Sequence, residues 1–458
     1  MEFLDRTEER ARLERFLSVE EGAMACLYGR RRIGKSRLLD EVLGGRRDVV
    51  LYCADQSEAS LQRARMAEDF SRLIIGLADS EYLDWRRFFE RWQRDAPKGS
   101  VMVIDELPYL IEKSPELPSV LQKIADDLRK TGQKIIICGS SQRMMQGLVL
   151  DEKEPLYGRC RVIMKLEPIA YGWLKKAFPK ESAFSRFANY AVLGGVPRYW
   201  EVCCDCGNLR AMMRDEIFSY QGLFHGEPSF VLKDDLDGAA QAASVLSLIG
   251  GGAERPAEMA SRLQLPQTAL GRPLKRLLDL GLIYRDIPFG AEAKGNKKAL
   301  YKIADPFLRF WYAFVLPHYS DKSFLGKKQD AEMFERPFRV FLGQAWEKLV
   351  RDNLVNHRLA DVDCDWRKVG RWWGTGINRQ PMEVDIVAES HDGKTLLVGE
   401  AKLKLTKKEY EHELAELKVK AKLLPFAKDY EQVVVKMFVA QGGELGCVDL
   451  NWVEDANK

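Results

Sequence analysis

The chain has 458 residues, 46% of them hydrophobic and 30% charged, and its 71 Lys and Arg against 68 Asp and Glu leave a formal charge of +3. At roughly 100 to 200 residues per domain, this length predicts two to four domains with ample core. The composition excludes long disordered segments. The near-neutral charge excludes a uniformly basic nucleic-acid coat, while leaving room for a local basic groove.

The N-terminus and the cysteines predict a cytoplasmic protein without a membrane segment. Residues 1–12 are dense in charge and lack the apolar segment of a secretory signal. Apolar stretches such as 307–317 contain an arginine or stop well short of the roughly 20 residues that cross a bilayer. Nine cysteines at irregular spacing do not make a disulfide framework, which fits a reducing compartment.

Residues 22–140 alternate short apolar runs rich in β-forming residues with longer helical patterns. This alternation predicts an α/β fold with a largely parallel sheet covered by helices. The predicted strands are 24–28, 49–53, 101–104 and 134–138, and the predicted helices include 58–77 and 119–130.

A phosphate-binding motif lies between the first predicted strand and the helix that follows it. The stretch Gly29-Arg30-Arg31-Arg32-Ile33-Gly34-Lys35-Ser36 matches G-x-x-x-x-G-K-[ST] and is followed by Arg37. Glycines let backbone N–H groups wrap a phosphate, and the helix N-terminus adds its positive end. We therefore expect residues 29–37 to bind ATP, with Lys35 on the β- and γ-phosphates and Ser36 holding Mg²⁺.

Two further sets of residues follow strands of the same predicted sheet. Asp105 and Glu106 end a buried apolar strand, so Asp105 can hold Mg²⁺ through water and Glu106 can polarise the attacking water. After the next strand, Ser140 or Ser141 can sense the γ-phosphate, although a serine-rich turn explains them as well.

The middle of the chain is predicted to be helical and then to change its pattern. Residues 181–221 read as helices. The segment 237–304 shows three helices, then two strands around a loop, which is the order of a winged helix-turn-helix. The predicted helices are 241–248, 256–263 and 266–280, and the predicted strands are 283–287 and 300–303.

Together these motifs resemble the archaeal-type AAA+/STAND-related ATPases of archaea and bacteria. The resemblance rests on Phe3-Leu-Asp-Arg6 with Glu8-Glu9, the two Walker motifs, Gly139-Ser140-Ser141, Pro155-Leu-Tyr-Gly-Arg159 and Gly194-Gly-Val-Pro197. It implies that Ser140 or Ser141 is the sensor, Arg159 an arginine finger and 194–197 a lid element. A surface ion pair is the alternative for Arg159. The family continues into a winged helix and a nuclease-like C-terminal domain of unknown function, whose entry resembles 301–312.

The last third carries a second constellation, Asp385-x14-Glu400-x-Lys402, on two adjacent predicted strands. Glu400 and Lys402 are two apart and share a strand face, and antiparallel pairing brings Asp385 beside them. Converging carboxylates such as Asp385 and Glu400 can bind a divalent metal, and a lysine can orient or deprotonate water. The pattern resembles the PD-(D/E)XK nuclease core, in which Glu347 stands where a first-helix acid is often found.

Three other basic stretches have both a functional and an ordinary explanation. A recognition face on the winged helix could contact DNA, or the module could serve only as a lid. Its candidate residues are Gln267, Thr268, Arg272, Lys275 and Arg276. The run 367–373 could grip a nucleic-acid strand, or form a solvated hairpin with a core Trp pair. Residues 402–422 read as a solvated helix face.

The predicted domain order is an ATPase core (1–180), a helical lid (181–236), a winged helix (237–304), an aromatic-rich connector (305–335) and a PD-(D/E)XK-like domain (336–458). We expect a Mg²⁺-dependent ATPase whose nucleotide state controls the last domain, acting on or binding nucleic acid. The alternative is a nucleotide-dependent switch whose nuclease-like domain only binds. If Arg159 acts in trans, the protein works as a homo-oligomer.

Overall fold

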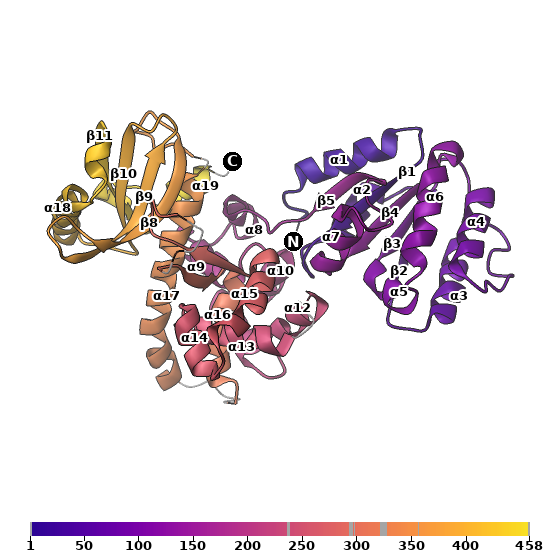
Figure 1. The fold of residues 1–458 in the computed structure, drawn as a ribbon, viewed down its shortest axis with the longest axis horizontal. Helices are drawn as coiled ribbons and strands as arrows, with labels where there is room; N and C mark the ends of the chain where they lie inside the picture. Colours follow the sequence, from indigo (N-terminus) through magenta and orange to yellow (C-terminus); the bar gives the residue numbers. More distant parts are fainter. Residues whose placement is uncertain are drawn as a thin grey trace.

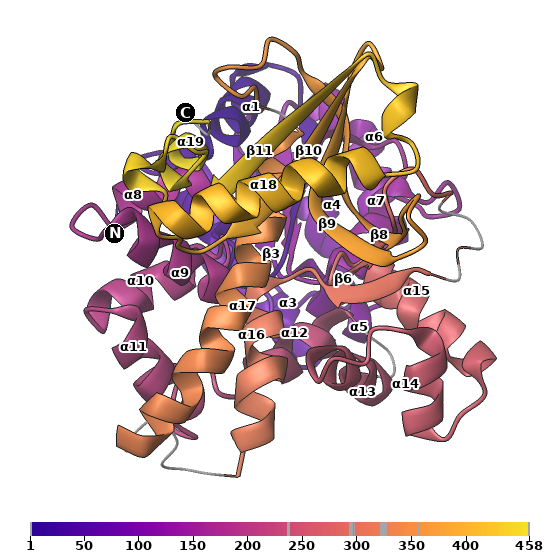
Figure 2. The same cartoon turned by 90° about the vertical axis from the view of Figure 1, so that its left-hand side faces the viewer.

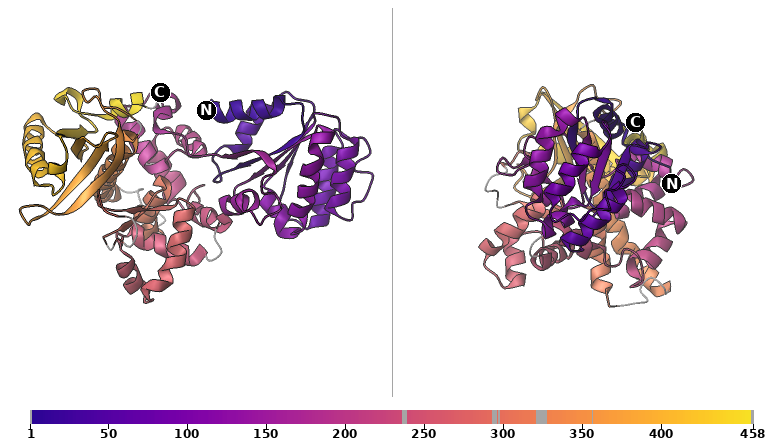
Figure 3. Two further views of the ribbon diagram at one scale, coloured as in Figure 1. Left: turned by 45° about the horizontal axis from the view of Figure 1, so that its top comes forward. Right: turned by 90° about the vertical axis from the view of Figure 1, so that its right-hand side faces the viewer.

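The computed structural model describes residues 2–235, 239–292, 296, 298–320, 328–355 and 357–456. An α/β unit lies at one end of the long axis and a smaller sheet from the C-terminal part lies at the other, with helices between them (Figure 1, Figure 3). All nine cysteines are free thiols, in line with the predicted absence of a disulfide framework. Within these described ranges, no helix combines the length and the apolar character that a membrane span requires.

The N-terminal unit is a five-stranded parallel sheet. Its strands are β1 (Ala23–Tyr28), β2 (Val49–Cys53), β3 (Val101–Asp105), β4 (Lys134–Gly139) and β5 (Cys160–Lys165). Its helices are α1 (Thr7–Ser18), α2 (Lys35–Leu43), α3 (Ala59–Phe70), α4 (Trp85–Asp95), α5 (Leu107–Lys113), α6 (Leu117–Thr131) and α7 (Gln142–Leu150). The strand order is β2-β3-β4-β1-β5, and every neighbouring pair is parallel.

Apolar side chains on both faces of this sheet are buried under helices. On β1, Ala25 and Leu27 belong to the cluster that includes α1 and α2, whereas Met24 and Cys26 belong to the cluster that includes α3, α4 and α6. A sheet covered on both faces needs apolar residues at every strand position, which is why its strands read as continuous apolar runs. The predicted helix-covered parallel sheet is confirmed.

The predicted helix at 58–77 is shorter in the structure, because α3 ends at Phe70. The hydroxyl of Ser71 donates to the carbonyl of Ala67 at 2.8 Å and accepts from the N–H of Ala78 at 3.1 Å. A serine bonded in this way competes with the helical hydrogen-bond ladder, and the chain turns there instead of continuing.

The segment after β5 is helical, as predicted. It contains η1 (Tyr171–Trp173), α8 (Leu174–Ala177), α9 (Ala183–Leu193), α10 (Pro197–Asp205), α11 (Leu209–Met212), the π-helix η2 (Met213–Phe218) and α12 (Glu227–Asp235). The core of this helical segment is continuous with the α1/α2 side of the parallel sheet.

Three helical elements and a two-stranded antiparallel sheet follow in the predicted order. They are α13 (Ala239–Gly250), α14 (Pro256–Leu263), the 3-10 turn η3 (Gln267–Leu270) with α15 (Gly271–Asp279), and the strands β6 (Ile283–Asp286) and β7 (Leu300–Ile303). The third helix was predicted to be one continuous element over 266–280, and this prediction was wrong. Pro273 has no N–H, so it fits the first turn of α15 but would break a helix that began at 266.

The aromatic-rich connector is helical where it is described, in α16 (Pro306–Phe310), the π-helix η4 (Trp311–Val315), the 3-10 turn η5 (Leu316–His318) and the start of α17 (Lys328–Leu354). Residues 321–327 of the predicted connector lie outside the described residues. The helix α17 then runs from the helical segment to the C-terminal sheet (Figure 1, Figure 2).

The C-terminal sheet is mixed and has the order β11-β10-β9-β8. Its elements are β8 (Trp366–Thr375), β9 (Pro381–Ser390), β10 (Thr395–Lys402), α18 (Lys407–Leu423), η6 (Ala427–Asp429), β11 (Gln432–Val439), η7 (Gly443–Leu445) and α19 (Leu450–Ala456). The strands β8, β9 and β10 are antiparallel neighbours, and β11 is parallel to β10. One face packs on α17 and the other on α18, which crosses the sheet (Figure 2).

The sequence did not predict β8 as a strand. Its three charged residues and two glycines hide any apolar alternation, because β8 is an edge strand and carries the charges that such strands use to avoid further pairing. Its Trp366 is buried in the core beside α17, while Trp372 is buried beside α18. Residues 367–373 thus lie in an antiparallel hairpin with β9, as the solvated-hairpin interpretation expected, but of its predicted core Trp pair only Trp372 is buried and Trp373 is half-buried.

Candidate functional site

The phosphate-binding loop closes tightly between β1 and α2. Gly29 and Gly34 have φ values of +155° and +97°, and a Cβ on Gly29 would lie 2.7 Å from the carbonyl oxygen of Leu166. Only glycine tolerates both positions. The ammonium of Lys35, which is 6% exposed, donates to the carbonyl of Gly29 at 2.9 Å, so the lysine folds over the loop.

Four side chains meet at the carboxyl ends of β1, β3 and β4. The hydroxyl of Ser36 donates to Asp105 Oδ2 at 3.1 Å. Ser140 donates to Glu106 Oε2 through its backbone N–H at 3.0 Å and through its hydroxyl at 2.9 Å. Glu106 has a left-handed φ of +54°, which turns the chain directly after the strand. Strands that are parallel end at one edge, so residues predicted from three separate motifs come together here.

The sensor prediction is refined by these contacts. Ser140 lies in the array and holds the carboxylate of Glu106 in place. Ser141 instead caps α7, where its hydroxyl accepts from the N–H of Met144 at 3.3 Å. Of the two serines, Ser140 therefore contacts the carboxylate of Glu106, whereas Ser141 starts a helix.

The three arginines of the loop point toward the helical segment and α16. Arg30 forms an ion pair with Asp305 and donates to the hydroxyl of Tyr199 at 3.0 Å. Arg32 pairs with Glu227 at 2.9 Å, and Glu227 also accepts from Tyr199 at 2.8 Å. Tyr199 and Glu227 are fully buried, so these contacts form a closed polar network beneath the loop.

The other two arginines of 29–37 also contact the helical segment. Arg31 lies over the ring of Phe230 at 5.5 Å, and Arg37 pairs with Glu201 at 2.5 Å. The predicted lid element 194–197 touches the loop as well, because Pro197 Cγ lies 3.9 Å from an ideal Cβ on Gly34. The loop is thus joined to the predicted lid by most of its side chains.

Arg6 has a structural role that its sequence context does not predict. Arg6 is buried, and its guanidinium donates to the carbonyl of Ile33 at 3.3 Å and to that of Glu167 at 2.6 Å. The arginine thereby fixes the phosphate-binding loop to the segment that leaves β5. Asp5 and Arg6 both have positive φ, a local conformation that the sequence does not show.

Arg159 lies at the other end of the sheet from the phosphate-binding loop. The next residue, Cys160, pairs with Met24 at the beginning of β1, whereas the loop follows Tyr28 at its end. Arg159 forms an ion pair with Asp126 at 3.2 Å, as the alternative interpretation expected. The arginine therefore does not reach the nucleotide site of its own chain, and a role as finger requires a second subunit.

In the C-terminal sheet, Asp385 and Glu400 lie on neighbouring antiparallel strands. Gly399 of β10 pairs with Ile386 of β9, and Glu400 and Asp385 lie directly beyond this pair. A bulge places residues 385 and 386 of β9 opposite Arg371 alone, which turns Asp385 out of the regular alternation. The N–H of Ala401 donates to Asp385 Oδ2 at 3.0 Å.

Both oxygens of Glu400 are held by lysines. Lys402 donates to Oε1 at 3.1 Å and Lys420, on α18, donates to Oε2 at 3.2 Å. The sequence interpreted residues 402–422 as a solvated helix face. That was wrong for Lys420, because the helical period brings this residue to the sheet side of α18.

Glu347 on α17 completes the predicted acids. It pairs with Arg351 at 3.6 Å, and Arg351 also donates to the carbonyl of Asp385 at 2.8 Å. Burial, followed by the charges of Glu347 and Glu400, raises the pKa of Asp385 to about 7. Across the described part of the chain, no three His, Cys, Asp or Glu side chains are gathered as a metal site, so the predicted ligands influence one another by charge without forming such a cluster.

This raised pKa predicts a pH-dependent stability in metal-free buffer. A carboxyl group that holds its proton more tightly when folded stabilises the fold below its folded pKa. The free energy of unfolding should therefore fall from about pH 4 to about pH 7 and then level off. Asp385→Asn should remove this fall and stabilise the chain at pH 8 by about 1 to 3 kcal/mol.

Urea unfolding in EDTA at pH 5 and pH 8 measures the effect. Asp363→Asn, at an almost fully exposed acid of the same domain, is the matched control and should leave the pH dependence unchanged. Parallel pH profiles for the parent chain and Asp385→Asn would contradict the expectation.

The predicted recognition face of 237–304 is partly exposed to solvent. Gln267, Thr268, Arg272 and Lys275 are exposed on η3 and α15, whereas Arg276 is half-buried. Exposed cations on one helix can contact a phosphate backbone.

Two family models match most of the chain. Residues 3–199 match an ATPase domain found predominantly in Archaea, and residues 311–414 match archaeal and bacterial proteins of unknown function. An uncharacterized protein of Methanocaldococcus jannaschii is 29% identical over 412 residues, which cover 88% of each chain. The first match contains the phosphate-binding loop with Asp105, Glu106 and Ser140, and the second contains Glu347, Asp385, Glu400 and Lys402.

A solved structure shares the fold. The Walker-type ATPase of Pyrococcus abyssi superposes with a TM-score of 0.51 at 21% identity, covering 68% of this chain and 96% of that one. The ORC2 protein of Aeropyrum pernix, solved as ADPNP–ADP complexes, gives a TM-score of 0.48 at 15% identity, covering 69% and 94%. With the loop geometry and the domain match, the predicted P-loop fold with a parallel sheet is confirmed: this chain is an ATPase whose residues 3–199 match the predominantly archaeal domain and whose residues 311–414 match a family of unknown function.

Proposed function

We propose that the chain hydrolyses ATP with Mg²⁺ and uses its nucleotide state to control the C-terminal sheet domain, which acts on or binds nucleic acid. The observation that carries the control is the ion pair between Arg30 of the phosphate-binding loop and Asp305 of α16. It joins the first matched family to the segment that leads into the second.

The site's oxygen atoms fit a magnesium ion. Ser36 and Asp105 present a hydroxyl and a carboxylate 3.1 Å apart at the start of α2, and hard oxygen ligands are those that Mg²⁺ prefers. Bound there, the ion would neutralise charge between the β- and γ-phosphates. Lys35 would bind the same phosphates once it leaves the carbonyl of Gly29.

Glu106 is the proposed base that orients the attacking water, and Ser140 is its positioning residue. The two hydrogen bonds from Ser140 fix one oxygen of the carboxylate, which leaves the other to accept from water. If γ-phosphate draws the serine hydroxyl away, Glu106 is released, so these two residues would make hydrolysis responsive to the phosphate. Arg159 would complete such a site only from a second subunit.

Contacts on the far side of α16 supply a physical connection to the C-terminal sheet. Pro306 lies 3.2 Å from an ideal Cβ on Gly194 in the predicted lid element. On α9, the ring of Phe187 packs edge-on against Trp346 of α17 at 5.9 Å. The indole of Trp346 donates to the carbonyl of Phe438 on β11 at 2.9 Å. A shift of the lid would therefore move buried rings that touch the sheet.

The C-terminal domain is proposed to be PD-(D/E)XK-like. Its chain order is helix α17, strands β8 to β10, helix α18 and strand β11, and Asp385 and Glu400 lie on neighbouring antiparallel strands with Lys402 two residues after Glu400. In an active nuclease these groups would hold a divalent ion and orient water for attack on a phosphodiester. Exposed Arg272 and Lys275 of the proposed winged helix would contact the nucleic-acid backbone.

A specific observation favours the alternative, in which this domain only binds. Lys402 and Lys420 occupy both oxygens of Glu400, so a metal ion would have to displace two ammonium groups. Paired in this way, Glu400 has the geometry of a structural ion-pair network.

An assay of metal-dependent DNA cleavage distinguishes an active nuclease domain from one that only binds. Plasmid and single-stranded DNA would be incubated with Mg²⁺ or Mn²⁺, with and without ATP, for the parent, Asp385→Ala and Lys35→Ala. We expect cutting that is lost in Asp385→Ala and altered in Lys35→Ala. Cutting that survives Asp385→Ala would come from a contaminant, and ATP turnover without any cutting would establish the binding alternative.

A further inference from the structure

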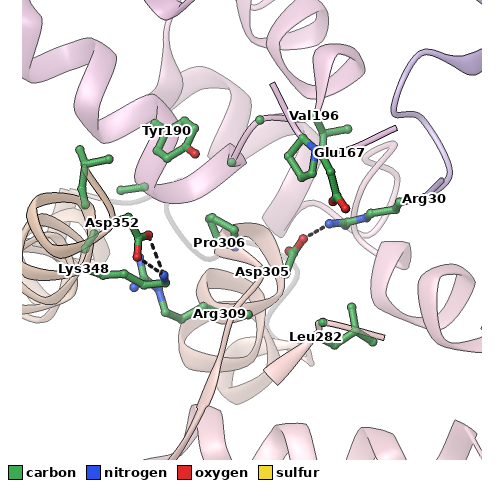
Figure 4. A pocket seen from close by; sticks show the side chains of 18 of the residues that line it. Arg30, Glu167, Tyr190, Val196, Leu282, Asp305, Pro306, Arg309, Lys348 and Asp352 are labelled. Carbon is green, nitrogen blue, oxygen red and sulfur yellow. Dashed lines mark hydrogen bonds and ion pairs between the residues drawn. The ribbon is translucent and has the colours of Figure 1, made fainter. Parts of the chain in front are cut away.

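A cavity of about 260 Å³ lies where the ATPase unit, the helical segment, the β6–β7 region and α17 meet. Its walls include Glu167 after β5, Tyr190 of α9, Leu282 before β6 and Leu349 of α17. Lys35, Ser36, Asp105 and Glu106 are not among the lining residues, so this cavity is distinct from the nucleotide site. Figure 4 shows two polar ends separated by Pro306.

The cavity wall contains four cations and three acids, and each acid has a cation of its own. Arg30 pairs with Asp305 and Lys165 pairs with Glu167 at 2.6 Å. At the other end, Lys348 pairs with Asp352 at 2.7 Å (Figure 4). The fourth cation, Arg309 of α16, is left over.

The side chain of Arg309 makes no hydrogen bond or ion pair with any residue that the structure describes. Its Nε is buried without a partner, and its guanidinium lies over the ring of Phe341 at 4.5 Å. Burial lowers the pKa of Arg309 to about 10, which still leaves it charged near neutral pH. Arg309 is half-buried, and Asp352 and Glu347 act on it through their charges without forming an ion pair with it. An anion that pairs with the guanidinium would offset the cost of burying this charge.

We propose that this cavity binds a small anion, a phosphate or a carboxylate, between Arg309 of α16 and Lys348 of α17. The volume is below that of a pocket for a drug-sized ligand and fits a compact anion. A planar guanidinium makes two parallel hydrogen bonds to either group. The anion would share Lys348 with Asp352, and the hydroxyl of Tyr190 faces the same space (Figure 4).

Such a ligand would act as an effector that links the ATPase unit to the C-terminal domain. One end of α16 holds the phosphate-binding loop through Asp305, and one turn later Arg309 faces α17. An anion that bridges Arg309 and Lys348 favours the arrangement in which α16 and α17 are packed together. The inference does not depend on hydrolysis or on nuclease activity.

Calorimetric titration of the full chain tests the site. Because the phosphate-binding loop can also bind phosphate, every protein carries Lys35→Ala. The probes are inorganic phosphate and citrate, which distinguish the two ligand classes. We expect binding of at least one probe that weakens by at least about tenfold with Arg309→Met and is partly retained with Arg309→Lys. Arg339→Met removes an exposed cation from α17 and should change nothing.

Thermal melting of the same proteins separates a binding arginine from a structural one. Without added anion, Arg309→Met should melt at or above the temperature of its parent, because it removes an unpaired buried charge. With the binding probe, only proteins that retain Arg309 or Lys at this position should gain stability. The proposal is overturned if neither probe binds, if Arg309→Met binds like its parent, or if Arg309→Met melts lower in the absence of anion.

Discussion

Replacing Glu106 with Gln is expected to reduce ATP turnover by about 10² to 10⁴ while ATP still binds. The amide keeps the size of the carboxylate and can remain near Ser140, but it cannot accept a proton from water. Lys35 and the loop backbone, which would bind the phosphates, are unchanged. Steady-state phosphate release and fluorescent-nucleotide titration measure the two quantities separately.

Two further variants control this result. Glu112→Gln changes an exposed acid on the same helix, α5, and should turn over ATP like the parent. Lys35→Ala should lose both binding and turnover, because the ammonium contributes to both. If Glu106→Gln hydrolyses ATP nearly as fast as the parent, Glu106 is not the base. If Lys35→Ala binds and hydrolyses ATP like the parent, the phosphate-binding loop is not the nucleotide site.

Replacing Asp305 with Asn is expected to destabilise the junction by about 3 kcal/mol, because it leaves Arg30 buried without its counter-charge. Arg30 is 9% exposed, and among the described residues its guanidinium would then keep one hydrogen-bond partner, the hydroxyl of Tyr199. Asp305 also caps α16, where Oδ1 accepts from the N–H of Leu308 at 2.8 Å. Asparagine can still cap, so Asp305→Ala should cost about 1 kcal/mol more.

Urea unfolding measures this cost, and Asp84→Asn is the matched control. Asp84 caps α4 in the same way, through the N–H of Arg87 at 2.9 Å, but it is half-exposed. The control should stay within about 0.5 kcal/mol of the parent. If Asp305→Asn behaves like Asp84→Asn, the Arg30–Asp305 pair contributes little, and the proposed control of the C-terminal domain loses its main support.

The ATP site was largely predictable because each of its parts follows a short local pattern. Gly29 to Ser36 carries its chemistry in eight consecutive residues, and Asp105 and Glu106 end an apolar run. Parallel strands end at one edge, so the order of motifs was enough to bring them together. The antiparallel pairing of the two strands that carry Asp385 and Glu400 was predictable in the same way, since a tight turn between two strands fixes their register.

The places where the prediction was wrong or incomplete depend on contacts between distant segments. Arg159 lies at the far end of the sheet because β5 pairs with β1, and no local sequence pattern predicts the register of that pairing. Lys420 reaches Glu400 only because α18 packs on that face of the sheet. β8 was missed because an edge strand needs no apolar alternation.

The sequence by itself determined the chemistry of this protein: the phosphate-binding loop, its acids, the parallel sheet and the acids of β9 and β10. Glycine conformation, strand periodicity and motif order are local properties, and they can be predicted directly from the residues. Only the tertiary structure decided which charges meet. The Arg30–Asp305 pair spans 275 positions, and the unpaired state of Arg309 depends on every element around it. Such contacts form when separate elements are packed, so no local pattern encodes them.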